Sequence, residues 1–153
     1  MDQVEEKLKQ MGYTLPTVPS PAANYLPYRI SGKQLYLSGV LPVIDGSLSH
    51  TGAVGDRQTV EAGYEAARNC ALNVLAGIKG AIGSLDQISQ ILLLNGFVQG
   101  VAGFSQSSQV INGASDFLVE VLGEAGGHAR AAVAVAGLPL DATVELQVVV
   151  EVS

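Results

Sequence analysis

Residues 126–153 constrain the fold more than any other stretch, because they hold two apolar runs separated by a Gly-Leu-Pro-Leu-Asp segment. This pattern is typical of two β-strands joined by a turn. Each run contains a charged residue, Arg130 in the first and Glu145 near the start of the second. A charge in a half-buried strand costs free energy unless it is paired or used. Arg130 and Glu145 are therefore the first candidates for function.

The second run alternates strictly. Glu145 lies on one face, and the other face is entirely apolar: Val144, Leu146, Val148, Val150 and Val152. Successive side chains of a strand point to opposite faces of the sheet. Glu145 is therefore predicted to lie away from a core that helices cover.

A hairpin through residues 137–141 would place Arg130 roughly 10 Å from Glu145, at ~3.4 Å per residue. That separation is too large for an ion pair and suits the two ends of a small molecule. A guanidinium binds a carboxylate through two parallel hydrogen bonds, and a glutamate can polarise a water or move a proton. The alternative is that both residues are surface charges with no specific role.

Strand and helix patterns alternate along the rest of the chain. Residues 25–31 and 34–40 predict two paired strands, and residues 59–82 and 109–123 carry apolar residues at helical spacing. The continuous apolar centre of residues 87–98 predicts a strand buried on both faces. With the two C-terminal strands, the order is ββαβαββ, an α+β fold in which one sheet packs on two helices.

Two segments lie outside this pattern. Asp2 is predicted to cap a short helix over residues 3–11, and the proline-rich residues 14–24 are predicted to be extended. Residues 41–57 form a loop that is too polar for the core, and Gly126-Gly127 is expected to end the second long helix.

Composition indicates that identical copies cover part of the surface. Only 14% of the residues are charged, against roughly 25% in typical soluble domains, and 48% are hydrophobic. The alternative is a core rich in alanine and glycine. The length is that of one domain, so residues 1–153 are expected to form a single domain. Residues 1–24 are its lead-in, a short helix followed by a proline-rich stretch.

Charge and side-chain content argue against several functions. The net charge is −6 and the cations are scattered, whereas nucleic-acid binding needs a basic patch. The single cysteine, Cys70, lies on an apolar helical row and is interpreted as a core residue, and neither His50 nor His128 has partners at metal-ligand spacing. No apolar run approaches the ~20 residues that span a bilayer, and the first residues are charged, unlike a signal peptide. We therefore expect a cytoplasmic protein that binds neither a metal nor a membrane.

At this point three segments resemble a known family. Residues 129–145, Ala-Arg-Ala-Ala-Val-Ala-Val-Ala-Gly-Leu-Pro-Leu-Asp-Ala-Thr-Val-Glu, resemble the C-terminal signature of the Rid family, also called YjgF/YER057c/UK114. Leu-Tyr-Leu-Ser-Gly at residues 35–39 is similar to a family strand that ends in Ser-Gly, and Val-Ile-Asn at 110–112 to a segment of its second helix.

The resemblance implies a chorismate-mutase-like fold and a homotrimer with sites in clefts between subunits. It also implies hydrolysis of 2-aminoacrylate-type enamines and imines to 2-oxo acids and ammonia, without a cofactor. The partner would be a small metabolite that carries a carboxylate.

The resemblance also implies roles for individual residues. Arg130 would bind the substrate carboxylate, and Glu145 would position the attacking water, assisted by the backbone carbonyl of Ala132. The cleft would be lined by Asn112, Tyr25 and Gly39, although Tyr28 lies close enough to Tyr25 to compete for its place. His128, beside Arg130, is a secondary candidate.

The chain departs from the family pattern where Val40 replaces the usual glutamine after Ser-Gly, and in its longer N-terminus and longer 41–57 loop. An imine deaminase is the first hypothesis, and a non-catalytic protein that binds small carboxylates is the second. An endoribonuclease, an activity also attached to the family, is a third, against which the acidic charge weighs.

Overall fold

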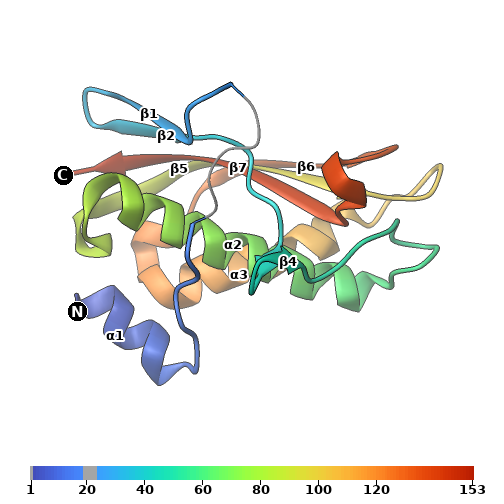
Figure 1. Ribbon diagram of the computed structural model, residues 1–153, viewed down its shortest axis with the longest axis horizontal. Helices are drawn as coiled ribbons and strands as arrows, with labels where there is room; N and C mark the ends of the chain where they lie inside the picture. Colours follow the sequence, from blue (N-terminus) through green and yellow to red (C-terminus); the bar gives the residue numbers. More distant parts are fainter. Residues whose placement is uncertain (1, 19–23) are drawn as a thin grey trace.

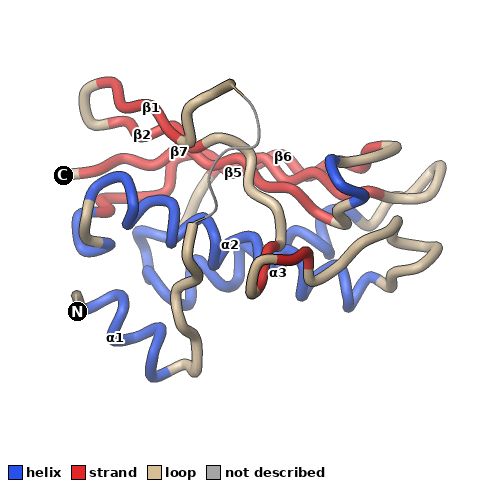
Figure 2. Tube along the Cα trace, in the orientation of Figure 1, coloured by secondary structure: helices blue, strands red, loops and turns tan. Residues whose placement is uncertain are grey.

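A computed structural model describes residues 2–18 and 24–153. It contains a mixed five-stranded sheet in the order β1-β2-β7-β5-β6, with α2 and α3 side by side on one face (Figures 1 and 2). The strands and helices, in chain order, are α1 Gln3–Gln10, β1 Tyr28–Ser31, β2 Gln34–Leu37, β3 Val43–Ile44, β4 Ser47–Leu48, α2 Val60–Ile82, β5 Ile88–Gln99, α3 Ser107–Leu122, β6 Ala129–Val135 and β7 Val144–Val152. The ββαβαββ order and the α+β class are confirmed.

The two long helices begin and end where local signals place them. Thr59 caps α2 by accepting a hydrogen bond from the Ala62 amide at 3.0 Å, and Gly83 ends the helix with a φ of 85°. Cys70 is fully buried on the α2 face against the sheet, as predicted. α3 ends at Leu122 with Gly123 as its cap, so the prediction that Gly126-Gly127 ends it was wrong.

The alternation of β7 is confirmed. The side chains of one face are buried against the helices: Val144, Leu146, Val148, Val150 and Val152. Glu145 lies half-buried on the opposite face. Glu145 pairs across the strands with Phe97 of β5, so these two side chains share that face.

The hairpin predicted through residues 137–141 does not form. β6 pairs in parallel with β5, and β7 lies antiparallel between β5 and β2. Parallel neighbours need a long crossover, and α3 supplies it between β5 and β6. The chain then turns through a 3-10 segment at Pro139–Asp141, where Leu140 has a φ of 58°, and enters the sheet on the other side of β5.

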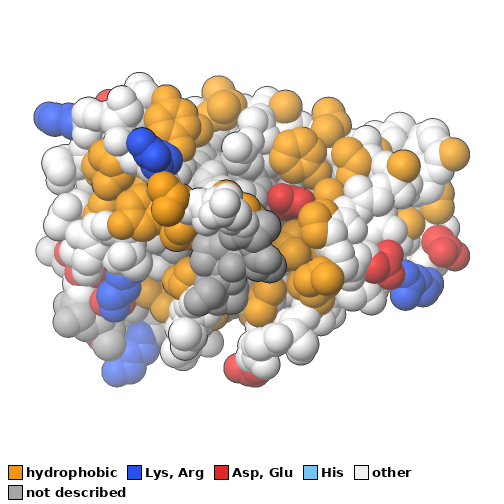
Figure 3. Space-filling view, turned by 45° about the horizontal axis from the view of Figure 1, so that its top comes forward, with side chains coloured by type: hydrophobic (Ala, Val, Ile, Leu, Met, Phe, Trp, Pro, Cys, Tyr) orange, Lys and Arg blue, Asp and Glu red, His pale blue; other side chains and the backbone are white. Residues whose placement is uncertain are grey.

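The second face of the sheet carries no helix among the described residues. Tyr36 and Val133 are 44% and 46% exposed there, and Leu93 and Phe97 of β5 are only partly buried. Burial of β5 on both faces, predicted from its apolar centre, is therefore wrong within one chain. Figure 3 shows apolar side chains spread across this part of the surface. We call it the open face.

The N-terminal helix packs onto the body of the protein as an added element. Asp2 and Glu5 form a capping box, as the sequence suggested for Asp2, and Leu8 is buried in the core. Residues 14–18 form no helix or strand, while residues 19–23 of the predicted extended stretch lie outside the described residues.

The 41–57 loop differs from the prediction in two ways. It contains a short hairpin of β3 and β4, and Val54 is 1% exposed within the core, so the loop is not excluded from the interior. Within the part of the chain that the structure describes, none of the helices is long and apolar enough to cross a membrane.

Candidate functional site

The Glu145 carboxylate rests directly on the backbone of Gly39. A Cβ atom added at Gly39 would lie 2.0 Å from Glu145 Oε2, so only glycine permits this contact. Burial raises the pKa of Glu145 above its ordinary value. The site therefore holds a carboxyl group that is easier to protonate than a solvated glutamate.

Backbone pairing beyond β2 holds Gly39 in this position. The Val40 amide donates to the Leu146 carbonyl at 2.7 Å, and the Leu146 amide donates back to Val40 at 2.9 Å. Tyr25, 52% exposed in the segment before β1, lines the same cavity as Gly39. We call Tyr25, Gly39 and Glu145 the Glu145 group.

Arg130 lies on edge strand β6 and faces the helices. It is in register with buried Leu94. Its Nη1 donates to the Ser115 hydroxyl at 3.0 Å, and its Nη2 donates to the Ser108 carbonyl at 3.3 Å, both on α3. The guanidinium is thus held against α3 at the end of the sheet.

Ser115 links Arg130 to His128. The Ser115 hydroxyl lies 2.8 Å from His128 Nε2, and His128 Nδ1 lies 2.6 Å from the Gly126 carbonyl. A carbonyl only accepts, so Nδ1 carries the proton donated to Gly126, while Nε2 and the Ser115 hydroxyl form a second hydrogen bond. The serine oxygen then accepts from Arg130, which gives a continuous chain of hydrogen bonds from Gly126 to the guanidinium.

Two more predicted residues lie near Arg130. Asn112 falls between Ser108 and Ser115 at spacings of four and three residues, which places it on the same face of α3. Ala132 follows Arg130 by two positions on β6 and packs against the core, so it shares the helix side of the strand. We call Asn112, His128, Arg130 and Ala132 the Arg130 group.

Within one chain, the two groups do not converge. Arg130 faces the helices, whereas Glu145 faces the open face two strands away, with β5 between them. Strand spacing and register put their backbones about 14 Å apart. The expectation that one hairpin presents both residues to one molecule is therefore corrected.

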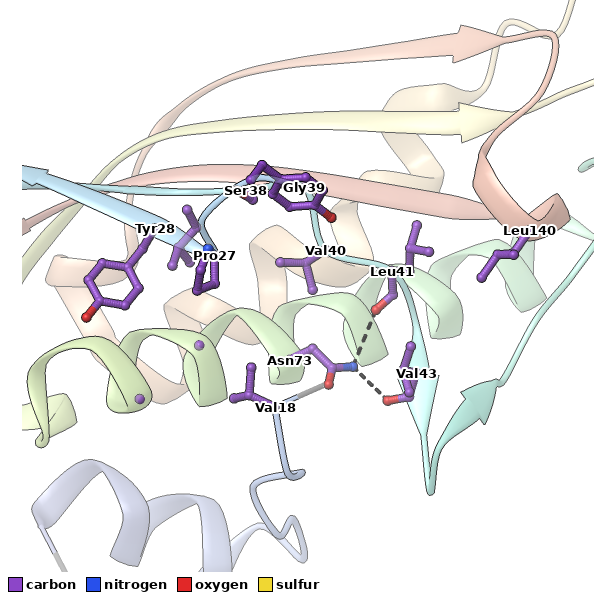
Figure 4. A pocket seen from close by; sticks show the side chains of 14 residues that line it. Val18, Pro27, Tyr28, Ser38, Gly39, Val40, Leu41, Val43, Asn73 and Leu140 are labelled. Carbon is purple, nitrogen blue, oxygen red and sulfur yellow. Dashed lines mark hydrogen bonds between the residues drawn. The ribbon is translucent and has the colours of Figure 1, made fainter. Parts of the chain in front are cut away.

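A cavity of about 390 Å³ is lined in part by Tyr25 and Gly39, and no pattern in the sequence predicted it. Figure 4 shows it between α2 and the chain that leaves β2. Asn73 of α2 donates to the Val43 carbonyl at 2.8 Å and to the Asn69 carbonyl at 3.0 Å, which fixes one wall. The rest of the lining is mainly aliphatic.

Sequence reasoning missed the serines that contact Arg130. Ser108, Asn112 and Ser115 recur at helical spacing along α3, and this polar row beside the apolar rows was the available signal. Among residues 2–18 and 24–153, no three His, Cys, Asp or Glu side chains gather as metal ligands would. Burial raises the pKa of the Cys70 thiol well above its usual value, with the charge of Glu145 adding to the effect.

Comparisons with known proteins agree with this fold. The family model "YjgF/chorismate_mutase-like, putative endoribonuclease" matches residues 5–152. The chain is 43% identical over 152 residues to Protein TCP17 of Trypanosoma cruzi, which covers 99% of this chain and 95% of that protein.

Solved structures are similar as well. Atu1372 of Agrobacterium tumefaciens, a protein of unknown function, is 46% identical with a TM-score of 0.93, over 98% of this chain and 92% of that one. E. coli TdcF, whose structure holds bound serine, shares the fold at 22% identity and a TM-score of 0.62, over 89% of this chain and 94% of that one. The family model covers nearly the whole chain, and TCP17 and Atu1372 are each more than 40% identical to it. This chain therefore belongs to the YjgF/chorismate mutase-like family.

Proposed function

We propose that the protein hydrolyses small reactive enamines and imines of the 2-aminoacrylate type to 2-oxo acids and ammonia. The observation that carries this proposal is the half-buried Glu145 carboxyl, with its raised pKa and its contact with Gly39. Such a group can accept a proton from water and pass one to a leaving nitrogen. Arg130 supplies the cation that a substrate carboxylate requires.

The cleft is proposed to lie between subunits of a homotrimer. Arg130 and Glu145 occupy opposite faces of one sheet, so two copies are needed to bring them to one small molecule. The open face, with Tyr36 and Val133 exposed, offers apolar area for a neighbouring copy. That the oligomer has three subunits is what the family resemblance implies.

In this cleft, Arg130 of one subunit holds the substrate carboxylate, with Asn112 and His128 beside it. Glu145 of the next subunit takes a proton from a water as that water attacks the carbon of the C=N bond, assisted by the Ala132 carbonyl. The proton passes to nitrogen and gives a carbinolamine. Its hydroxyl proton then moves through Glu145 to the same nitrogen, the C–N bond breaks, and ammonia leaves as the carbonyl forms. An enamine first accepts a proton on its methylene carbon and so becomes the imine.

A coupled assay tests this function. 2-Aminoacrylate and 2-iminobutanoate are generated in situ, and formation of the 2-oxo acid is followed. Arg130→Ala is expected to lower kcat/KM about 10- to 100-fold, the range for hydrogen bonds to a charged group, and Glu145→Gln chiefly to lower kcat. The control is Lys33→Ala, which removes an exposed cation at the tip of the β1-β2 turn. Equal activity in all four proteins would contradict the proposal.

Two other functions predict different observations. A non-catalytic protein for small carboxylates, an idea that the serine in TdcF favours, predicts saturable binding without turnover. An endoribonuclease predicts RNA cleavage that persists through purification and is lost in Glu145→Gln. The net charge of −6 argues against the second of these.

A further inference from the structure

A serine, a histidine and a glutamate form a hydrogen-bonded cluster beside α2, apart from the Glu145 and Arg130 groups. Ser49 and His50 directly follow β4, and Glu65 and Asn69 lie one turn apart on α2 (Figure 1). The Ser49 hydroxyl lies 2.8 Å from His50 Nδ1, and Nε2 of the same ring lies 3.8 Å from Glu65 Oε2. The cluster joins a hydroxyl, an imidazole and a carboxylate in series, which is how a serine nucleophile, its base and an orienting acid are arranged.

The Glu65 carboxylate favours one placement of the proton on His50. A carboxylate accepts hydrogen bonds and repels a lone pair, so the proton of the neutral ring is more stable on Nε2, which faces Glu65. Nδ1 then presents its lone pair to the Ser49 hydroxyl. The Asn69 side-chain nitrogen donates to the Ser49 oxygen at 3.0 Å and cannot take its proton. His50 is therefore placed to act as a general base toward Ser49.

The base is held in place while the hydroxyl is open to solvent. The His50 side chain is only 16% exposed, and its carbonyl accepts from the Thr143 amide at 3.3 Å. The Ser49 amide donates to the Pro42 carbonyl at 2.8 Å, which anchors the backbone, and Ser49 itself is exposed. A molecule that reaches Ser49 from solvent thus meets a base that is already oriented.

Asn69 also offers a donor for the charge that develops when a hydroxyl attacks a carbonyl carbon. Within the described ranges, its side chain has no hydrogen-bond partner other than Ser49. The second hydrogen of Asn69 Nδ2 is therefore free to donate to a carbonyl oxygen placed at Ser49. Glu65, whose side chain is 58% exposed, adds a negative charge that disfavours an anionic reactant. The cluster suits a small uncharged ester.

We propose that Ser49 is a nucleophile that accepts the acyl group of small uncharged esters, with His50 as its general base. The Ser49 oxygen attacks the ester carbonyl carbon while its proton passes to His50 Nδ1. The bond from that carbon to the leaving oxygen breaks, and the leaving oxygen takes the proton from Nδ1. Ser49 then carries the acyl group as an ester, and His50 is neutral again. The reaction uses no residue of the Glu145 or Arg130 groups, so it does not depend on imine hydrolysis.

The ester 4-nitrophenyl acetate tests this reaction, because acetylation of the protein releases 4-nitrophenolate, whose absorbance is followed. Proteolytic digestion and mass spectrometry locate the acetyl groups. Ser49 is expected to be acetylated about 100-fold faster than Ser47, an exposed serine of β4 without a hydrogen bond to a histidine in the described structure. His50→Gln keeps a polar side chain but removes the base, and it is expected to slow acetylation of Ser49 by about the same factor.

Ser49→Ala and Ser47→Ala form the matched pair for the release of 4-nitrophenolate. Ser49→Ala is expected to lose the fast phase of release, and Ser47→Ala to keep it. Both serines are exposed, so neither substitution opens a cavity, and thermal unfolding checks that each variant keeps its fold. Acetylation of Ser49 that is no faster than that of Ser47 in the wild-type protein overturns the proposal. Acetylation of Ser49 at the wild-type rate in His50→Gln overturns it too, because the histidine then does not act as the base.

Discussion

Gly39 and Glu145 act as one unit although 106 positions separate them in sequence. The missing side chain at position 39 lets the backbone approach the carboxylate, and the resulting burial raises the pKa of Glu145. Any side chain at position 39 would therefore displace the Glu145 carboxylate from this place.

The raised pKa of Glu145 predicts a specific dependence of stability on pH. Below the ordinary glutamate pKa of 4.5, both the folded and the unfolded chain hold this proton. The raised pKa therefore does not change the free energy of unfolding there. As the pH rises through the raised pKa, the folded protein must ionise a half-buried group, so stability is lost. Glu145→Gln is therefore expected to be more stable than wild type at pH 8 and equal to it near pH 3.5.

Thermal unfolding of both proteins at several pH values measures this difference. Glu61→Gln is the control, since Glu61 is exposed in the first turn of α2, and it should show no such gain at pH 8. A stability advantage of Glu145→Gln that grows on acidification would contradict the expectation.

At the scale of elements, α3 orients the Arg130 side chain of β6 by accepting hydrogen bonds from its guanidinium. Ser115→Ala removes the acceptor for Nη1 of Arg130 and the partner of His128 Nε2. Loss of a hydrogen bond to a charged group predicts a rise in KM of about tenfold, with kcat little changed because Ser115 positions Arg130 and does not touch the reacting atoms. Steady-state kinetics separate the two constants. Ser115→Thr, which keeps the hydroxyl, should restore most of the binding, and a fall in kcat alone would contradict this role.

The elements also show what could be predicted from the sequence. α2 was predicted almost to its ends because Thr59 and Gly83 act on the neighbouring residues only. The pairing of β6 with β5 was not, because alternation specifies which face a strand buries and not which strand lies beside it. The α3 crossover decided that partner, and with it the faces on which Arg130 and Glu145 lie.

At the scale of the whole molecule, the cavity of the candidate site could not be predicted from the sequence, because local patterns do not specify which segments lie side by side. The cavity combines Val18, Gly39 and Gly77, which belong to three separate segments. Such a space depends on how the segments pack, and no local pattern encodes it. The choice of Arg130 and Glu145 as candidate site residues, by contrast, needed only the sequence, because both are charges placed within apolar strands.

The proposed assembly makes a quantitative prediction about mixed oligomers. If each cleft takes Arg130 from one subunit and Glu145 from the next, Arg130→Ala and Glu145→Gln each inactivate every cleft of a homotrimer. In trimers assembled at random from equal amounts of the two variants, a cleft is intact when each variant contributes its unaltered side, which occurs in about one quarter of clefts. Co-refolding the two variants is therefore expected to restore about a quarter of wild-type activity.

Native mass spectrometry of the mixture, with one variant isotopically labelled, confirms that subunits have mixed before activity is measured. Each variant refolded alone is the control and should remain at its own low activity. If mixed trimers form and no activity returns, Arg130 and Glu145 act from the same subunit. Their placement on opposite faces of the sheet would then require a rearrangement of β6 on assembly, because the strand register holds their backbones about 14 Å apart.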